Sequence, residues 1–304
     1  MSLEPALAAW QSPWLYGPAA TVLGLAVGSF LNVVVHRLPL MMERDWTEDI
    51  RTYFEDHKPS LPAKAARDLG AALGPDEPLS LVSPRSRCPA CRHALSALEN
   101  IPLLSFAWQR GRCRHCGHAI SWRYPVIEAL TAGLFLLALL ALGPNWQGLT
   151  ALAFIALLVP LAVIDLDHQL LPDSLSLGLL WLGLLVNLMG VHAALEDAVL
   201  GAALGYLSLR AVQLLFRALR GFEGMGGGDA KLLAALGAWS GWQLLPLIAF
   251  LAASIGVVVS LIALAATRRG AGERVAFGPY LALAGLAALL QGEALVGFVR
   301  DMVN

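Results

Sequence analysis

The sequence predicts an all-α polytopic membrane protein with about eight transmembrane helices and a small cytoplasmic zinc-ribbon domain inserted after the first helix. Of the 304 residues, 57% are hydrophobic and only 14% are charged, whereas soluble globular domains carry about 25% charged residues. Apolar runs long enough to cross a bilayer recur along the chain. Charge and all 4 cysteines are instead concentrated in one segment, residues 37–124.

The first transmembrane helix is predicted within residues 1–36, at about residues 16–36. The stretch YGPAATVLGLAVGSFLNVVVH is apolar and long enough to span the hydrocarbon core of a bilayer. Because no basic start with a short apolar core is present, a cleavable signal peptide is not indicated.

Residues 37–124 are predicted to form one polar domain. They carry 13 of the 21 Lys and Arg residues, and no run among them is long enough to span. The first part, about residues 41–83, is compatible with helix and has no assigned role. The net charge is −1 for the whole chain and +3 for this domain, so we expect no nucleic-acid partner.

The cysteines form two CxxC pairs, and the pairs are separated by 21 residues. Two such pairs at this separation are typical of a zinc ribbon, although disulfides are an alternative. Four thiolates make a closed, structural zinc site, which indicates the reducing, cytoplasmic side of the membrane. The predicted metal ligands are Cys88, Cys91, Cys113 and Cys116. The nearby histidines are expected to be surface residues rather than ligands: His93, His115 and His118.

The larger membrane domain, residues 125–304, is predicted to contain about seven helices. The spans are expected at about residues 125–143, 148–165, 173–191, 197–217, 230–242, 243–266 and 276–298. The span at 230–242 is short, but the positive charges favour counting it. With eight crossings and the N terminus outside, every cationic loop lies in the cytoplasm, whereas seven crossings would place Arg268, Arg269 and Arg274 outside.

This topology brings two distant aspartates to one face of the membrane. Asp165 ends the span at 148–165, and Asp229 begins the short span, both on the cytoplasmic side. An acidic residue within a membrane segment indicates a functional site. The alternatives are that Asp229 caps its helix or that both residues lie at solvated helix ends. Asp173, which follows a proline, is best explained as a cap.

A close pair of carboxylates shares a proton and so presents a base and an acid together. One carboxylate can deprotonate a water molecule while the other polarises a peptide carbonyl, which is the aspartic-protease mechanism. The glycines from Gly224 to Gly228 would give a peptide backbone room to approach. A flexible turn between helices would also use glycines.

Four motifs resemble one family, the type IV prepilin peptidases, which are bifunctional leader peptidase/N-methyltransferases and membrane aspartic proteases of the GxGD type. The motifs are GSFLNVVVHRLP (28–39), the cysteine segment (83–128), IDLDHQLLPD (164–173) and GMGGGDAKLLAALGAWSGW (224–242). The resemblance covers nearly the whole chain except about residues 41–83.

The resemblance implies that Asp165 and Asp229 are the catalytic residues. It implies that the substrates are prepilins and pseudopilins of type IV pilus and type II secretion systems, cut after a glycine that follows a short basic leader. The new N-terminal residue would then be methylated with S-adenosylmethionine. The expected location is the inner membrane, in contact with lipid, with a periplasmic N terminus and a cytoplasmic zinc domain and active site.

Two alternatives stay open. A transporter or channel would use the membrane carboxylates as proton or cation sites, but inverted repeats with paired broken helices are then expected. The dense glycine break before Asp229 has no equally glycine-rich counterpart. A peptidase without methyltransferase activity is the other alternative, since no glycine-rich strand–turn–helix that would indicate a nucleotide-type site occurs in residues 37–124. Nothing in the sequence indicates the oligomeric state or the residues that bind S-adenosylmethionine.

Overall fold

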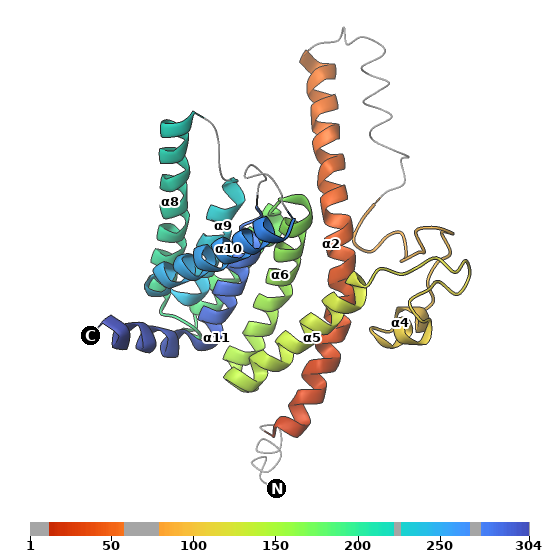
Figure 1. Ribbon diagram of the computed structural model, residues 1–304, viewed down its shortest axis with the longest axis horizontal. Helices are drawn as coiled ribbons and strands as arrows, with labels where there is room; N and C mark the ends of the chain where they lie inside the picture. Colours follow the sequence, from red (N-terminus) through yellow and green to blue (C-terminus); the bar gives the residue numbers. More distant parts are fainter. Residues whose placement is uncertain (1–11, 58–78, 222–225, 268–274, 304) are drawn as a thin grey trace. The chain divides into compact units, whose positions relative to one another are not determined.

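The computed structural model describes residues 12–57, 79–221, 226–267 and 275–303. The chain divides into two compact units, Ser29–Glu128 and the remainder, Met1–Gly28 with Ala129–Asn304. Across the described ranges the chain is helical, with two isolated β-bridges and no strand (Figure 1). The predicted all-α fold class is confirmed.

A helix lies at each place where the sequence predicts a span. The bounds are α2 Pro13–His57, α5 Arg123–Leu142, α6 Trp146–His168, α7 Asp173–Asn187, α8 Leu195–Arg220, α9 Gly227–Ser240, α10 Leu245–Thr267 and α11 Gly278–Val303. Within the described ranges, five helical segments are long and apolar enough to cross a membrane, and α7 and the first part of α11 are shorter apolar helices. The number of crossings therefore stays a prediction.

The short helix α9 lies at the centre of the larger unit. It packs against α7, α8, α10 and α11, and its residues Leu232–Trp239 are all buried. A helix enclosed by other helices does not need to match the bilayer thickness, which explains why 14 residues are sufficient here.

Small residues let α8 approach α9 closely. Gly201 and Gly205 are four positions apart on α8. A Cβ on Gly201 would collide with the Gly237 carbonyl of α9, and one on Gly205 would lie 2.7 Å from the Leu233 carbonyl oxygen. This is the close backbone packing that small residues permit between membrane helices.

Asn187 and Trp239 fix the end of α9 that is farther from Asp229. The Trp239 indole donates to the Leu179 carbonyl (2.8 Å). The Asn187 amide donates to the carbonyls of Ala238 and Trp239 at 2.8 and 3.1 Å. Its carbonyl oxygen accepts from the backbone amides of His192 and Ala193, each at 3.0 Å. These buried polar groups are thus satisfied, as a low-polarity interior requires.

In the smaller unit, α2 continues well beyond the predicted end of its span, to His57. Residues 40–57 contain no glycine or proline to end it. Arg37 is only 9% exposed. It donates to the carbonyls of Ser80 and Pro84 at 2.8 and 2.6 Å. Residues 58–78, which follow α2, lie outside the described residues.

Candidate active site and metal centre

Asp165 lies in the last turn of α6 and is 5% exposed. The helix ends because Gln169 takes a left-handed conformation (φ 52°, ψ 41°), and its N–H donates to the Asp165 carbonyl. The Asp165 side chain accepts a hydrogen bond from the backbone N–H of Gly278, at the start of α11, with N to Oδ2 2.9 Å. Two helix ends separated by 113 residues therefore meet at this carboxylate.

Asp229 lies in the first turn of α9 and is 8% exposed. The N-cap residue of this helix is Gly226, and no side-chain cap bond is formed there, so Asp229 does not cap the helix. The side-chain amide of Gln213, in α8, donates a hydrogen bond to the Gly226 carbonyl at 2.7 Å and so holds Gly226 in place.

Leu171 lies against both Gly228, which precedes Asp229, and Gly278, which binds Asp165. A Cβ on Gly228, the residue before Asp229, would lie 2.8 Å from the Leu171 Cβ. A Cβ on Gly278 would lie 3.2 Å from the Leu171 Cδ2 and 2.7 Å from the Asp165 Oδ2. The structure thus brings both predicted acids to the same end of the larger unit.

An ion pair braces this end. Lys231, two residues after Asp229, contacts both carboxylate oxygens of Asp173 at 2.6 and 2.7 Å. It joins the first turn of α7 to the first turns of α9. Because both side chains are partly exposed, the pair adds little stability.

The glycines around Asp229 differ in how crowded they are. Among the described residues, a Cβ on Gly226 or Gly227 would meet no heavy atom within 4 Å, whereas one on Gly228 would collide with Leu171. The described part of the chain therefore leaves space at Gly226 and Gly227, just before Asp229. Gly224 lies outside the described residues.

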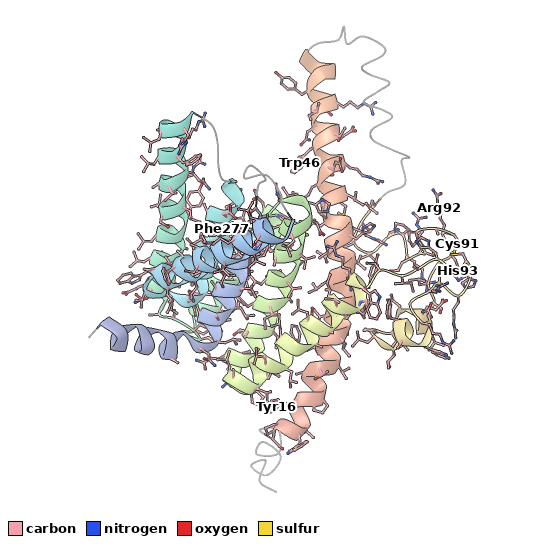
Figure 2. The ribbon with its side chains drawn as sticks, viewed as in Figure 1. Tyr16, Trp46, Cys91, Arg92, His93 and Phe277 are labelled. Atoms are coloured by element: carbon pink, nitrogen blue, oxygen red, sulfur yellow. The ribbon has the colours of Figure 1, made fainter. Side chains whose placement is uncertain are left out.

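Sequence reasoning missed Gly278, Leu171 and the partnership of Lys231 with Asp173. Gly278 belongs to a Phe-Gly-Pro run at the start of the last helix, and the group that contacts Asp165 is its backbone amide rather than a side chain. Figure 2 labels the neighbouring Phe277, which immediately precedes α11. A glycine followed by proline at a helix start was the available signal. It does not indicate that this glycine contacts Asp165, which lies 113 residues earlier in the chain.

The smaller unit contains two cysteine turns with the same backbone hydrogen bonds. RCPACRHA (87–94) and RCRHCGHA (112–119) share the pattern R-C-x-x-C-x-H-A. In each turn the amide of the first cysteine donates to the carbonyl of the last histidine, Cys88 to His93 at 2.9 Å and Cys113 to His118 at 2.8 Å. Each is closed by one β-bridge. The two halves of the site are thus structural repeats.

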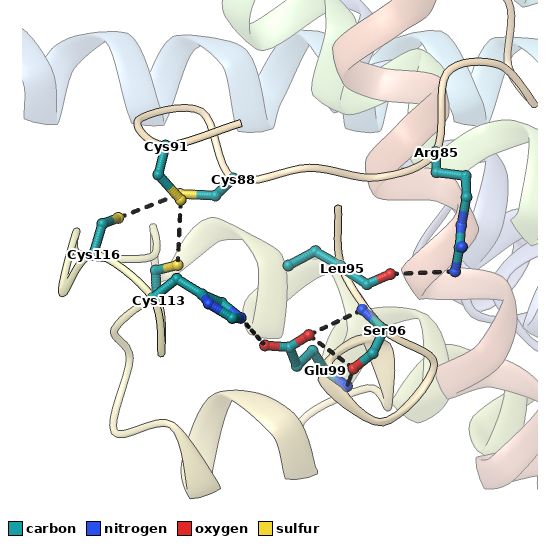
Figure 3. Close-up of polar contacts among 9 residues, drawn as sticks. Arg85, Cys88, Cys91, Leu95, Ser96, Glu99, Cys113 and Cys116 are labelled. Carbon is teal, nitrogen blue, oxygen red and sulfur yellow. Dashed lines mark hydrogen bonds and ion pairs between the residues drawn. The ribbon is translucent and has the colours of Figure 1, made fainter. Parts of the chain in front are cut away.

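The four sulfur atoms form a group able to hold one metal ion (Figure 3). The Sγ atoms of Cys88 and Cys116 are 3.7 Å apart, and those of Cys91 and Cys113 are 4.0 Å apart. A tetrahedral ion with about 2.3 Å metal–sulfur bonds requires sulfurs about 3.8 Å apart, so the residues fit.

Together, these features define a polytopic helical membrane protein with two buried carboxylates at one end of its larger unit and, in its smaller unit, a group of four cysteines able to hold a metal ion. Comparison with known proteins agrees with this class. Residues 22–142 match the Bacterial Peptidase A24 N-terminal domain, and residues 152–261 match the Type IV leader peptidase family.

Several curated relatives cover almost the whole chain. A protein of Aeromonas salmonicida named Prepilin leader peptidase/N-methyltransferase is 48% identical over 93% of each chain. Proteins with the same name are 48% identical over 93% of each chain in Aeromonas hydrophila and 46% identical over 90% of each chain in Pseudomonas aeruginosa. No solved structure matches the chain. The chain belongs to the type IV leader peptidase family.

Proposed function

We propose that this protein removes the basic leader from prepilins and pseudopilins at the cytoplasmic face of the inner membrane and then N-methylates the new N-terminal residue. The names of relatives that align over nearly the full length support both activities. The single observation that carries the peptidase assignment is the convergence of Asp165 and Asp229 through Leu171 and Gly278.

The hydrogen-bond partners of Asp165 and Asp229 indicate which carboxyl group is the general base and which is the general acid. The Gly278 N–H stabilises a negative charge on Asp165, which makes Asp165 the general base. Among the described residues, Asp229 accepts no comparable backbone bond, so Asp229 holds the shared proton and is the general acid.

The proposed reaction has two steps. In the first, a water oxygen bonds to the scissile carbonyl carbon, Asp165 takes the water proton, and Asp229 donates its proton to the carbonyl oxygen. In the second, the carbon–nitrogen bond breaks, and the departing amine takes the proton from Asp165. Asp229 regains a proton from a hydroxyl as the carbonyl re-forms. Both carboxyl groups return to their starting states.

The substrate would approach along the glycines. An apolar helix that follows the cleavage site can lie in the bilayer beside the protein, which places its leader in the cytoplasm. The open space at Gly226 and Gly227 admits an extended backbone to the carboxylates. The acidic segment at residues 165–173 suits a basic leader.

Zn²⁺ is the metal that we assign to the cysteines, because four thiolates form the closed site of a structural zinc ion. The sulfurs of Cys88, Cys91, Cys113 and Cys116 would hold it, and its contribution is to fold the segment rather than to react. S-adenosylmethionine is the proposed methyl donor, and we place methylation in the cytoplasmic domain, predicted at residues 37–124. The proposed eight-crossing topology rests partly on Arg268, Arg269 and Arg274, which lie outside the described residues.

Mass spectrometry of a substrate incubated with the purified protein tests both activities at once. We expect a prepilin to lose its leader and, only when S-adenosylmethionine is added, to gain one methyl group on its new N terminus. Cleavage without methylation would reduce the function to that of a peptidase. An intact substrate, together with ion flux through reconstituted vesicles, would instead indicate the transporter alternative.

A further inference from the structure

Three side chains beside the cysteines form a second cluster that neither proposed activity uses. His93, Glu99 and His115 each contribute one possible ligand atom, and these atoms lie within 4.8 Å of one another. The cluster is separate from the group of four sulfurs. His93 ends the first cysteine turn, His115 lies within the second, and Glu99 belongs to the short helix η1 (Leu98–Asn100). Figure 2 labels His93 close to Cys91.

Glu99 is held in place by Ser96. The Ser96 backbone amide and hydroxyl both donate to the Glu99 Oε2, at 2.9 and 2.7 Å (Figure 3). The other carboxylate oxygen, Oε1, lies 3.8 Å from the His115 Nε2. One carboxylate oxygen is therefore fixed by Ser96, and the other faces His115.

The two histidine rings lie close together. Their centroids are 3.5 Å apart, with an angle of 31° between the ring planes. The His115 side chain is 48% exposed and the Glu99 side chain 9%, so the carboxylate is largely covered, whereas the histidines leave the cluster a face that is open to solvent.

We propose that His93, Glu99 and His115 bind a second divalent transition-metal ion, distinct from the ion held by the cysteines. Two imidazole nitrogens and one carboxylate oxygen suit ions such as Zn²⁺, Co²⁺ and Ni²⁺. Ligand atoms at about 2.1 Å from a tetrahedral ion are about 3.4 Å apart, so the 3.8 Å separation of Glu99 and His115 requires only a small contraction. Three protein ligands leave at least one position for water or an exchangeable ligand.

The repeat of the cysteine turns supplies a matched control. His118 occupies the position in the second turn that His93 occupies in the first, and both carbonyls accept the same backbone bond. His118 does not belong to the cluster. A role in supporting the cysteine turns predicts similar effects for His93→Ala and His118→Ala, whereas a metal site predicts different effects.

The test is a count of metal ions per chain. The full-length protein in detergent, with its cysteine site loaded with zinc, is dialysed against increasing Zn²⁺ or Co²⁺, and bound metal is measured by mass spectrometry. We expect a second ion to bind saturably. Glu99→Gln, which keeps an oxygen for Ser96, and His93→Ala should each weaken that second ion by at least roughly tenfold. His118→Ala should bind two ions as the parent does.

With Co²⁺ as the probe, the second ion should add weak visible absorption without new sulfur-to-metal charge transfer. The zinc of the cysteine site, if retained in each variant, reports that the domain is folded. Saturation at one ion per chain would overturn the proposal without any variant. Binding of a second ion that survives both Glu99→Gln and His93→Ala would also overturn it, since that ion would be adventitious.

Discussion

Replacing Gly278 by alanine tests whether the Asp165 carboxylate must be held by the α11 backbone. The new Cβ would lie 2.7 Å from the Asp165 Oδ2 and 3.1 Å from its Cγ. An ordinary carbon–oxygen contact is about 3.3 Å, so Oδ2 must move by about 0.6 Å. That movement stretches the 2.9 Å bond from Gly278 towards its limit.

The expected cost follows from that bond. A hydrogen bond to a charged group contributes about 1.5–3 kcal/mol, which corresponds to roughly a 10- to 150-fold fall in kcat/KM for leader cleavage. The assay is prepilin cleavage in detergent, with thermal unfolding measured in parallel. Gly178→Ala in α7 is the matched control, because a Cβ there would meet no heavy atom of the described residues within 4 Å.

The reasoning would be refuted if Gly278→Ala cleaved at the parental rate. It would also be refuted if Gly178→Ala lost as much activity, since the effect would then not arise at Asp165.

Three further outcomes are expected. Gly201→Ala places a Cβ against the Gly237 carbonyl, so the protein should be destabilised by about 1–3 kcal/mol and its Tm should fall. An unchanged Tm would contradict the close packing of α8 against α9. Cys88→Ser, or a strong chelator, should remove zinc and make the cysteine segment sensitive to protease. The reason is that structural zinc contributes about 10–16 kcal/mol to the folding of small zinc domains. Unchanged digestion would argue against a structural ion. Burial lowers the pKa of His192 from 6.5 to about 4, so the unfolded chain binds a proton there that the folded chain does not. Stability should therefore fall as the pH is lowered from about 6.5 to about 4, and His192→Gln should flatten melting curves in that window; an unaltered pH dependence in that variant would exclude His192 as the cause.

Hydropathy was sufficient to predict where the helices lie, and cysteine spacing was sufficient to predict that the four cysteines form one group. The length of an apolar run indicates removal from water, and cysteine spacing indicates a local turn, so both can be read from neighbouring residues. The catalytic roles of Asp165 and Asp229, which the family resemblance implied, stay predictions. The short helix α9 could be located from its apolar residues, but its burial among other helices could not be predicted, because its apolar composition is the same whether lipid or protein surrounds it. Whether α9 crosses the membrane stays a prediction.

Contacts between distant segments could not be predicted in the same way. The bond from Gly278 to Asp165 uses a backbone amide, and no periodicity marks which amide will face a carboxylate. The histidines beside the cysteines were expected to be surface residues, and His93 and His115 are exposed. What the sequence did not reveal is that Glu99 reaches them, since this depends on how the segment between the two cysteine turns folds back.

The most direct test of the central claim is leader cleavage by Asp165→Asn and Asp229→Asn, alone and combined. Because the two carboxyl groups are proposed to act as one unit, each single variant should lose essentially all cleavage, and the double variant should lose no more. Thermal unfolding and zinc content should match those of the parent. Cleavage at the parental rate by either folded single variant would contradict the account.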